Sequence, residues 1–318
     1  MSLRGSGRVA LCAALVLALV LALGACATAP SPLAAEWYDL GNAWLDKGDY
    51  KRAGEAYRRA LGFDPSLAGA SYNWARALAE AGDYAGSLEI LDKLAKSDPE
   101  NARILAARAW VLYKSGRAAD ALAAYEALIA LDPYSPDAVF NAAVLKLAAG
   151  DAPGAAKDLE VLVKAKPEES KAVLLLGRAY DDALASATSD AERAAFASGA
   201  LAAFEKARAL GKADAAALER IGLAYADQAF ANKRPYLEAI TVLDEATQAD
   251  PKRSKAWFAL ARIRLTAAED GTGGLDALRK ALDAGFADKD KISTLLDIPA
   301  LLEREKAYTL LKDKGLAE

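Results

Sequence analysis

The sequence predicts an all-α fold made of stacked helix-turn-helix units. Alanine and leucine dominate the 318 residues, β-branched residues are sparse and strand-like alternation is hard to find, which favours helices. Glycines recur every 34 residues, at Gly48, Gly82, Gly116 and Gly150. Prolines recur at the same interval, at Pro65, Pro99, Pro133 and Pro167. Two series with one period and a fixed offset favour repeated helical hairpins over a non-repeating helical bundle.

The chain begins with a segment that is typical of a secretory signal. Two arginines precede an apolar run, "VALCAALVLALVLAL", which extends from Val9 to Leu23. As a helix this run is about 22 Å long, shorter than the roughly 30 Å hydrocarbon core of a membrane. We therefore expect a signal peptide rather than a permanent membrane span, with Cys12 as an apolar filler of the run.

The next residues, Leu23-Gly24-Ala25-Cys26, resemble a bacterial lipobox. The resemblance implies cleavage before Cys26 and lipidation of this cysteine, so that residues 1–25 are a lipoprotein signal peptide and 26–33 a flexible linker. Two or three acyl chains hold a protein stably on a membrane. By resemblance to enterobacterial sorting, Ala27 implies the outer membrane of the cell envelope, with the protein facing the periplasm. An ordinary signal peptide, cut near "ACA" or "ATA", is the alternative.

The composition excludes several chemistries. The chain has no histidine, the commonest general base and a frequent zinc or iron ligand. Its two cysteines, Cys12 and Cys26, match no metal-binding spacing, and no later cysteine is available for a disulfide. The formal net charge of −4 differs from the basic balance of nucleic-acid-binding proteins. We expect no cofactor, no metal and no nucleic acid.

The first repeat shows why each unit folds as a helical hairpin. Its first helix contains Trp37, Leu40, Gly41 and Trp44, and its second contains Ala53, Tyr57 and Ala60 before Pro65. Small side chains such as Gly41 let the two helices approach closely, and large ones such as Tyr57 fill the space beside them. A glycine ends the first helix and a proline stops the second. These residues resemble those of the tetratricopeptide repeat (TPR) family.

The resemblance implies a right-handed α-α superhelix, a TPR solenoid of about six to seven units with a C-terminal helical cap. The regular units are 34–67, 68–101, 102–135 and 136–169. Units 170–213 and 214–253 carry insertions, 254–286 is degenerate, and 287–318 forms capping helices. In the fifth unit Ser189 and Glu192 form a capping box, so we expect the extra residues to lengthen both of its helices.

The TPR resemblance also places certain first-helix residues on the concave surface, where aromatic, asparagine and arginine side chains suit a protein or peptide partner. The predicted groove residues are Asn42, Tyr72, Asn73, Arg76, Arg103, Trp110, Tyr113, Phe140, Asn141 and Arg178, with Tyr38 and Arg262 on the same face. We also weighed packing of Trp110 or Phe140 against a neighbouring unit. One TPR sub-family clamps a terminal carboxylate with five residues. Asn42 and Asn73 match this set, but Tyr38 and Ala107 replace its lysine and arginine, so another extended segment or a helix is expected.

These observations predict a non-catalytic, lipid-anchored periplasmic scaffold in cell-envelope assembly. The alternative is a TPR lipoprotein that serves a periplasmic solute transporter through a small-molecule pocket near units five and six. An enzyme would need carboxylates or lysines converging in that pocket. Asp181, Asp182 and Asp190 are expected at a solvated helix end, and "GTGG" at 271–274 is expected to be an inter-helix turn rather than a phosphate-binding loop.

Overall fold

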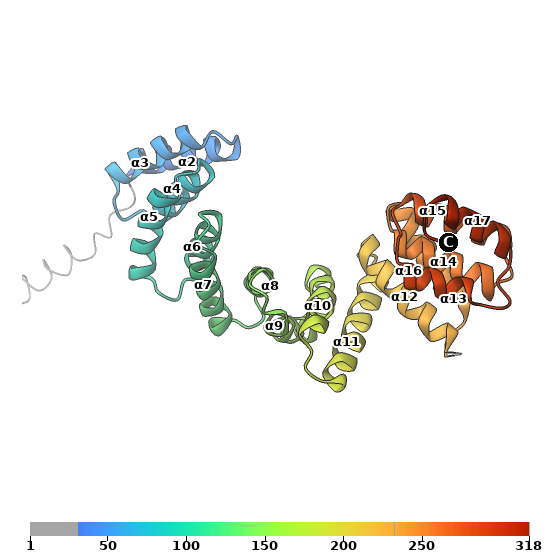
Figure 1. Ribbon diagram of the computed structural model, residues 1–318. Coiled ribbons are helices and arrows are strands. Elements are labelled where there is room, and N and C mark those ends of the chain that lie inside the picture. The colour runs from blue at the N-terminus through green and yellow to red at the C-terminus, as the bar shows by residue number, and fades with distance from the viewer. Residues whose placement is uncertain (1–30, 232, 318) are drawn as a thin grey trace, which may run out of the picture. The chain divides into compact units, whose positions relative to one another are not determined.

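The structure, a computed structural model, describes residues 31–231 and 233–317, and every element in these ranges is a helix (Figure 1). The predicted all-α helical-repeat fold is therefore confirmed. The predicted signal peptide and Cys26 lie outside the described residues. No helix in the described ranges is both long and apolar enough to cross a membrane.

The chain forms two compact units, one ending at Tyr125 and the other beginning at Glu126, so that the division falls within helix α7 (Ala118–Leu131). The other helices of the first unit are α2 (Pro32–Asp46), α3 (Tyr50–Phe63), α4 (Ala68–Glu80), α5 (Tyr84–Ser97) and α6 (Ala102–Lys114). Helices α2 and α3 pack as one hairpin, and α4 and α5 as the next.

The second unit contains four helical hairpins, followed by two short helices. Its helices are α8 (Pro136–Ala148), α9 (Ala152–Ala165), α10 (Ser170–Ala183), the 3₁₀ turn η1 (Leu184–Ser186), α11 (Asp190–Ala209), α12 (Ala215–Phe230), α13 (Tyr236–Ala249), α14 (Ser254–Thr266), α15 (Gly271–Asp283), α16 (Lys289–Leu296) and α17 (Arg304–Asp313). The boundaries assigned to the repeats from the sequence remain a prediction.

The 34-residue glycine series marks the turn inside each hairpin. Gly48 has a φ of 73°, a left-handed conformation that ends α2, and the next residue, Asp49, accepts a hydrogen bond from the Arg52 N–H and so caps α3. The same pair recurs at Gly82–Asp83 and Gly150–Asp151. The sequence pattern Gly-Asp thus ends one helix and starts the next.

The packing inside the first hairpin depends on the absence of a side chain at Gly41. A Cβ atom there would lie 2.6 Å from Cε1 of Tyr57, whose ring is completely buried. The close approach predicted for Gly41 is therefore present. Around Tyr57, alanines of α3 and α4 form the centre of a small core.

The insertion in the fifth unit lengthens only one helix. Helix α11 has 20 residues against 14 in the second helix α3, whereas α10 has 14 against 13 in the first helix α4, and η1 directly after α10 takes up part of the extra chain. The predicted cap is present, because Ser189 Oγ accepts the Glu192 N–H at 3.2 Å and the Glu192 carboxylate accepts the Thr188 N–H at 2.8 Å. The expectation that both helices lengthen is thus wrong for α10.

The "GTGG" segment is the first turn of α15 rather than a turn between helices. Asp270 caps this helix by accepting the Gly273 N–H at 2.9 Å, which stabilises a helix start despite the three glycines. A Cβ at Gly274 would lie 2.6 Å from Cγ of Leu265, so this glycine allows α14 and α15 to pack closely. The role of Gly274 in the structure is to let the two helices pack closely.

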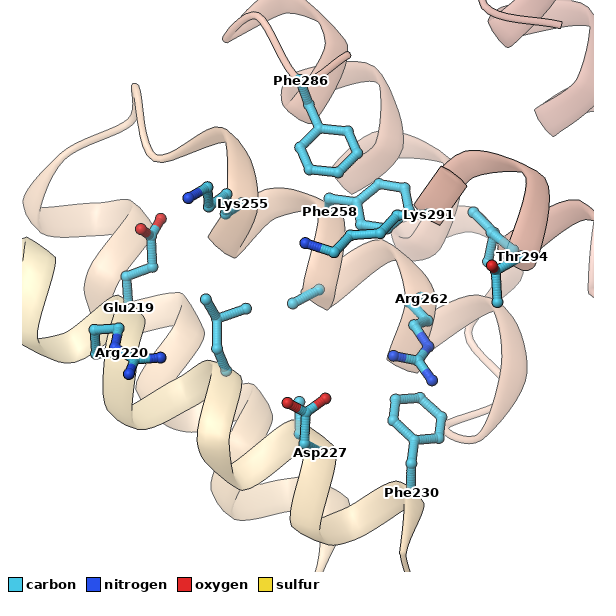
Figure 2. Close-up of a pocket in the computed structure, with 14 residues that line it drawn as sticks. Glu219, Arg220, Asp227, Phe230, Lys255, Phe258, Arg262, Phe286, Lys291 and Thr294 are labelled. Atoms are coloured by element: carbon cyan, nitrogen blue, oxygen red, sulfur yellow. The ribbon is translucent and has the colours of Figure 1, made fainter. Parts of the chain in front are cut away.

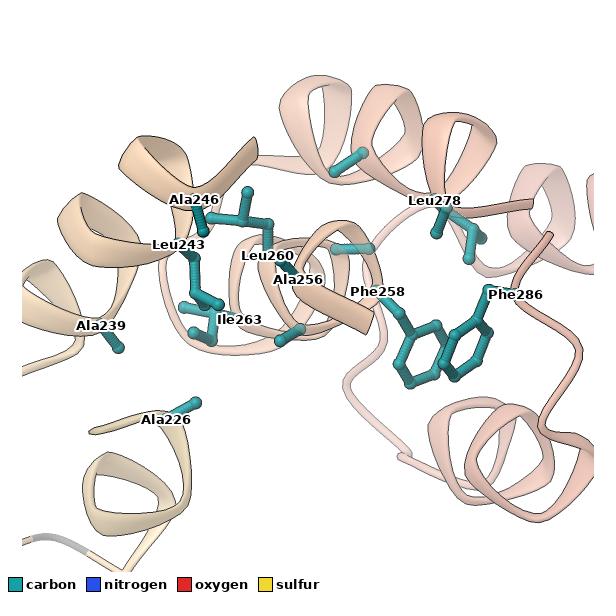
Figure 3. Close-up of a cluster of buried hydrophobic side chains, with 14 of the residues drawn as sticks. Ala226, Ala239, Leu243, Ala246, Ala256, Phe258, Leu260, Ile263, Leu278 and Phe286 are labelled. Carbon is teal, nitrogen blue, oxygen red and sulfur yellow. The ribbon is translucent and has the colours of Figure 1, made fainter. Parts of the chain in front are cut away.

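The core of the second unit is largest at its C-terminal end, where helices α11 to α17 share one apolar cluster (Figure 3). Leu243, Leu260, Ile263 and Leu278 are completely buried in it. Phe258 of α14 and Phe286, which follows α15, stack with their ring centroids 4.1 Å apart. This stack connects the last hairpin to the turn that leads into α16.

Candidate functional site

Helices α2, α3 and α4 meet in a hydrogen-bonded group of four polar side chains. The Tyr57 hydroxyl donates to Asn42 Oδ1 at 2.8 Å. Asn73 Nδ2 donates to the same Asn42 oxygen at 2.9 Å and to the Tyr38 hydroxyl at 3.3 Å. Burial, followed by the neighbouring Tyr38, raises the pKa of Tyr57 to about 12, so its phenol stays protonated and remains a donor.

Asn73 is the residue in this group whose hydrogen-bonding capacity is incomplete. Its side chain is 7% exposed, yet its Oδ1 accepts no hydrogen bond from any described residue. A buried amide oxygen without a donor costs about 1–3 kcal/mol. The structure therefore holds a buried acceptor, fixed by two hydrogen bonds from its own Nδ2, for which the described chain supplies no donor.

Asn73 also lines a pocket of about 170 Å³ between α2, α4 and α6. Tyr38 and Tyr72 supply aromatic surface, and the Arg103 guanidinium lies over the Tyr72 ring, 4.3 Å from its centroid. Asn101 begins α6 by accepting the Arg103 and Ile104 N–H groups, and so fixes the helix end that carries Arg103. The pocket thus combines two phenol rings, a buried amide and a cation.

The structure brings together four of the predicted groove residues in the first unit, namely Asn42, Tyr72, Asn73 and Arg103, along with Tyr38. Arg76 is exposed on α4. Its positive charge lowers the pKa of Tyr57, although the larger effect of burial raises it, so Arg76 lies close enough to act on this group electrostatically. These residues form what we call the N-terminal site: Tyr38, Asn42, Tyr72, Asn73, Arg76 and Arg103.

The other predicted groove residues lie elsewhere. Trp110 is half-buried and packs against the apolar cluster that includes Leu91, Ile104 and Val111, while Tyr113 on the same helix is 49% exposed. The packing role that we weighed for Trp110 is the one the structure shows.

In the second unit, Phe140 is likewise partly buried against an apolar cluster, this one formed by α8, α9 and α10. Asn141 is half-buried on α8, and Arg178 is exposed on α10, where its guanidinium is paired with the Asp214 carboxylate. The backbone N–H of Ala217 and the charge of Arg178 hold the pKa of Asp214 below its usual value, in spite of partial burial. Arg178 is therefore already neutralised by a helix-capping carboxylate.

Sequence reasoning assigned Tyr57 to the core and overlooked its hydroxyl. The ring is buried as expected, but the hydroxyl orients Asn42, and through it Asn73. The signal in the sequence was a tyrosine at a core position of the second helix of the hairpin. A buried tyrosine hydroxyl usually has a hydrogen-bond partner, so a polar side chain could have been expected next to it. Asn101 was also overlooked, although an asparagine just before a helix is a common cap.

The acidic residues considered beside the insertion do not form a metal site. Asp181 pairs with Arg220, whose Nε lies 2.8 Å from its carboxylate. In the part of the chain that the structure describes, no group of three or more histidine, cysteine, aspartate or glutamate side chains could hold a metal ion.

Paired helices, a repeated Gly-Asp turn and a polar–aromatic cluster on successive first helices define a helical-repeat protein. Family models described as tetratricopeptide repeat match residues 34–67, 72–136 and 112–179. The chain therefore carries tetratricopeptide repeats in this region, as its 34-residue period predicts. Among curated proteins, none gives a significant sequence match to the chain.

Solved structures of repeat proteins share the fold. A tetratricopeptide repeat protein from Parabacteroides merdae is 16% identical, with 83% of this chain and 98% of that chain aligned at a TM-score of 0.51. The Pseudomonas aeruginosa pilF protein is 18% identical over 70% of this chain and 95% of its own, also at 0.51. YrrB, described as a TPR protein with an unusual peptide-binding site, is 20% identical over 65% and 98%, at 0.50. At these identities the likeness concerns the fold, and none of these descriptions names an enzyme.

Proposed function

We propose that this protein is a lipid-anchored scaffold of the bacterial cell envelope, and that its N-terminal site binds an extended segment of a protein partner. The observation that carries the proposal is the pocket that brings Tyr72, Asn73 and Arg103 together, with an amide and a cation beside aromatic surface. An extended peptide offers backbone N–H and C=O groups at regular intervals, and polar side chains such as these suit such groups. Repeat proteins bind other proteins as a class, and YrrB is a structural neighbour described as having a peptide-binding site.

The side chains around Asn73 suit the rest of such a segment. Tyr38 and Tyr72 present flat apolar surface, which gives contact area to a peptide side chain at a low cost in conformational entropy. Arg103 is held over Tyr72 and has no carboxylate partner among the described residues, so it can donate to a peptide carbonyl or an acidic side chain. The site requires no cofactor, and we propose no catalysis and no nucleic acid for it.

The envelope location is proposed from the sequence alone. Cys26 at the end of the apolar run would carry the acyl chains, and the short linker after it would hold the N-terminal site near the membrane. The partner is then expected in the periplasm at the same membrane, and Ala27 favours the outer membrane.

Photo-crosslinking tests the N-terminal site. We would replace Tyr72 with p-benzoylphenylalanine in cells, and compare it with the same replacement at Tyr134, an exposed tyrosine in the turn after α7. A specific adduct is expected at position 72 and not at 134. Equal labelling at both positions would contradict the proposal.

Binding of the crosslinked segment, synthesised as a peptide, then tests the chemistry. Arg103→Gln should weaken this binding about tenfold, the effect of losing one charge-assisted hydrogen bond. The matched control is Arg117→Gln, which removes an exposed arginine just before α7 that pairs with Asp120 in the first turn of that helix. Unchanged binding by Arg103→Gln would exclude this pocket as the contact site.

Mass spectrometry of the mature protein tests the anchor. A lipoprotein should begin at Cys26 and carry two or three acyl chains, and Cys26→Ser should abolish processing and labelling by radioactive palmitate. Cys12→Ser, inside the apolar run, should leave both unchanged. A mature chain that begins at another residue without a lipid would refute the anchor and leave the N-terminal site to be judged by crosslinking.

A further inference from the structure

A second pocket, of about 390 Å³, opens between α12, α14 and α16 in the second unit (Figure 2). This volume falls in the range of small-molecule sites, roughly 300–1,000 Å³. Its lining residues on α12, Glu219 to Phe230, belong to the sixth unit. The pocket therefore lies near units five and six, where the alternative function led us to look, but not beside the insertion of the fifth unit. Near that insertion Tyr180 instead donates its hydroxyl to Glu160 at 2.5 Å.

One side of this pocket is aromatic. Phe258 and Phe286 stack in parallel with an interplanar angle of 11°, and both are more than nine-tenths buried in the core. Phe230, at the end of α12, lies on the opposite side, with the Arg262 guanidinium 3.9 Å from its ring centroid. Flat rings fixed on two sides favour a flat apolar ligand body.

The charges of the pocket are unbalanced. Four cationic side chains line it, Arg220, Lys255, Arg262 and Lys291, against two carboxylates, Glu219 and Asp227. Figure 2 shows the Lys291 ammonium below the stacked rings and the Arg262 guanidinium over the Phe230 ring, with Asp227 to one side, so two cations lie beside apolar surface.

Several of these groups are already engaged. Arg220 pairs with Asp181 on α10. Glu219 accepts the Ala256 N–H at 3.3 Å and lies 4.0 Å from Arg253, which lies outside the pocket lining.

The remaining groups leave an excess of positive charge. Lys291 pairs at 3.3 Å with Asp288, an exposed residue before its own helix. Within residues 31–231 and 233–317, Lys255 and Arg262 form no ion pair, and Asp227 is the one lining carboxylate that is not held by another group. An anion would therefore gain from Arg262 and Lys291 together.

We propose that this pocket binds a small organic acid, a single carboxylate carried on a flat aromatic or apolar body. Arg262 and Lys291 would bind the carboxylate, and the Phe258–Phe286 stack and Phe230 would hold the body. The site is independent of the N-terminal site, because its lining residues all belong to the second unit. The same chemistry could be supplied by a free acid or by the carboxyl-terminal residue of a peptide that ends in an aromatic side chain.

Three matched probes separate the two parts of the recognition. N-acetyl-L-phenylalanine carries both the ring and the carboxylate, its amide lacks the charge, and N-acetylglycine lacks the ring. By titration calorimetry with the full-length protein, the first should bind saturably and each of the others about tenfold more weakly or worse. Equal binding of the acid and its amide, or no saturable binding of the acid, would overturn the proposal.

Variants locate the binding. Lys291→Gln should weaken N-acetyl-L-phenylalanine about tenfold, whereas Lys289→Gln, two residues earlier on the same helix and outside the pocket lining, should not. Arg262→Gln should weaken it at least as much, with an unchanged thermal transition showing that the fold persists. If Lys291→Gln and Lys289→Gln bind equally well, the pocket is not the site.

Peptide probes decide the source of the acid. The tripeptide Ala-Ala-Phe with a free carboxylate is compared with N-acetyl-L-phenylalanine, and with the same tripeptide as an amide. Tighter binding of the free tripeptide would assign the pocket to a peptide terminus, and weaker binding would assign it to a free small acid. A tripeptide amide that binds as well as the free tripeptide would contradict the proposed role of the carboxylate.

Discussion

Replacing Gly41 by alanine should disturb the first hairpin and, through it, the N-terminal site. The new Cβ would lie 2.6 Å and 2.7 Å from Cε1 and Cδ1 of Tyr57, well inside the 3.5–4.0 Å of an ordinary carbon contact. Tyr57 has no free space, since it is completely buried and its hydroxyl is held by Asn42. The ring must move, and its hydrogen bond must lengthen with it.

The size of the effect follows from two opposed contributions. Overpacking of a filled core costs about 1–3 kcal/mol, while alanine in place of glycine inside a helix gains up to about 1 kcal/mol. We therefore expect Gly41→Ala to lower the free energy of unfolding by about 1–2 kcal/mol. Gly62, near the end of α3, has no neighbouring atom within 4 Å of the place that a new methyl group would take, so Gly62→Ala should instead stabilise by about 0.5 kcal/mol.

Urea unfolding followed by far-ultraviolet circular dichroism measures this difference. Three tryptophans that pack against the core around Tyr57, namely Trp37, Trp44 and Trp74, provide a second, local readout of the same transition. Gly41→Ala should unfold at lower urea than the wild type and Gly62→Ala at slightly higher urea. If the two variants stabilise equally, close approach at Gly41 is not what holds the hairpin together.

Three further changes test single contacts. Tyr57→Phe keeps the ring and removes one hydrogen bond, so unfolding should become about 1 kcal/mol easier in urea; an unchanged midpoint would show that the hydroxyl contributes nothing. Hydrogen bonding to Arg208 lowers the pKa of Glu245 below 4.5, so its carboxylate stabilises the folded state above that pH and ceases to do so as the pH falls through the folded-state pKa. Wild type should therefore exceed Glu245→Gln in unfolding free energy by less than about 1 kcal/mol at pH 7, because the pair is half-exposed, and by less still in acid. Thermal unfolding that gives the same difference at pH 7 and pH 3 would contradict this assignment. Trp110→Ala should cost about 2 kcal/mol and Tyr113→Ala less than about 0.5 kcal/mol, and equal costs in urea would place Trp110 on the surface instead.

The regular half of the fold could be predicted because its physical causes are local. A glycine that adopts positive φ, an aspartate cap and a proline stop each act within one turn, and their 34-residue spacing repeats them in register. The sequence could not predict that α11 would take most of the extra length. A capping box fixes where a helix begins, but it does not show whether the residues before it extend the preceding helix or form a loop.

The residues that line the two pockets could be predicted from the sequence to different extents. Asn73 was placed on the correct face from its position in the repeat, but its burial depends on Tyr38 and Asn42 of the preceding unit. The sequence suggested a small-molecule pocket near units five and six, but it did not indicate that Phe286, at the end of the degenerate unit, and Lys291, beyond it, would line that pocket. Without a period beyond residue 286, nothing in the sequence indicated that α16 would line a pocket together with α14.

The hydrogen-bonded group around Asn73 has a consequence for the thermodynamics of helices α2, α3 and α4. A ligand that binds only the folded chain stabilises it by RT ln(1 + [L]/Kd), about 2.7 kcal/mol at one hundred times Kd. Because α2, α3 and α4 are joined through Asn42, Tyr57 and Asn73, the amide protons of these three helices should gain protection from hydrogen exchange together when a partner binds. The partner's concentration would then set how often this end of the chain opens.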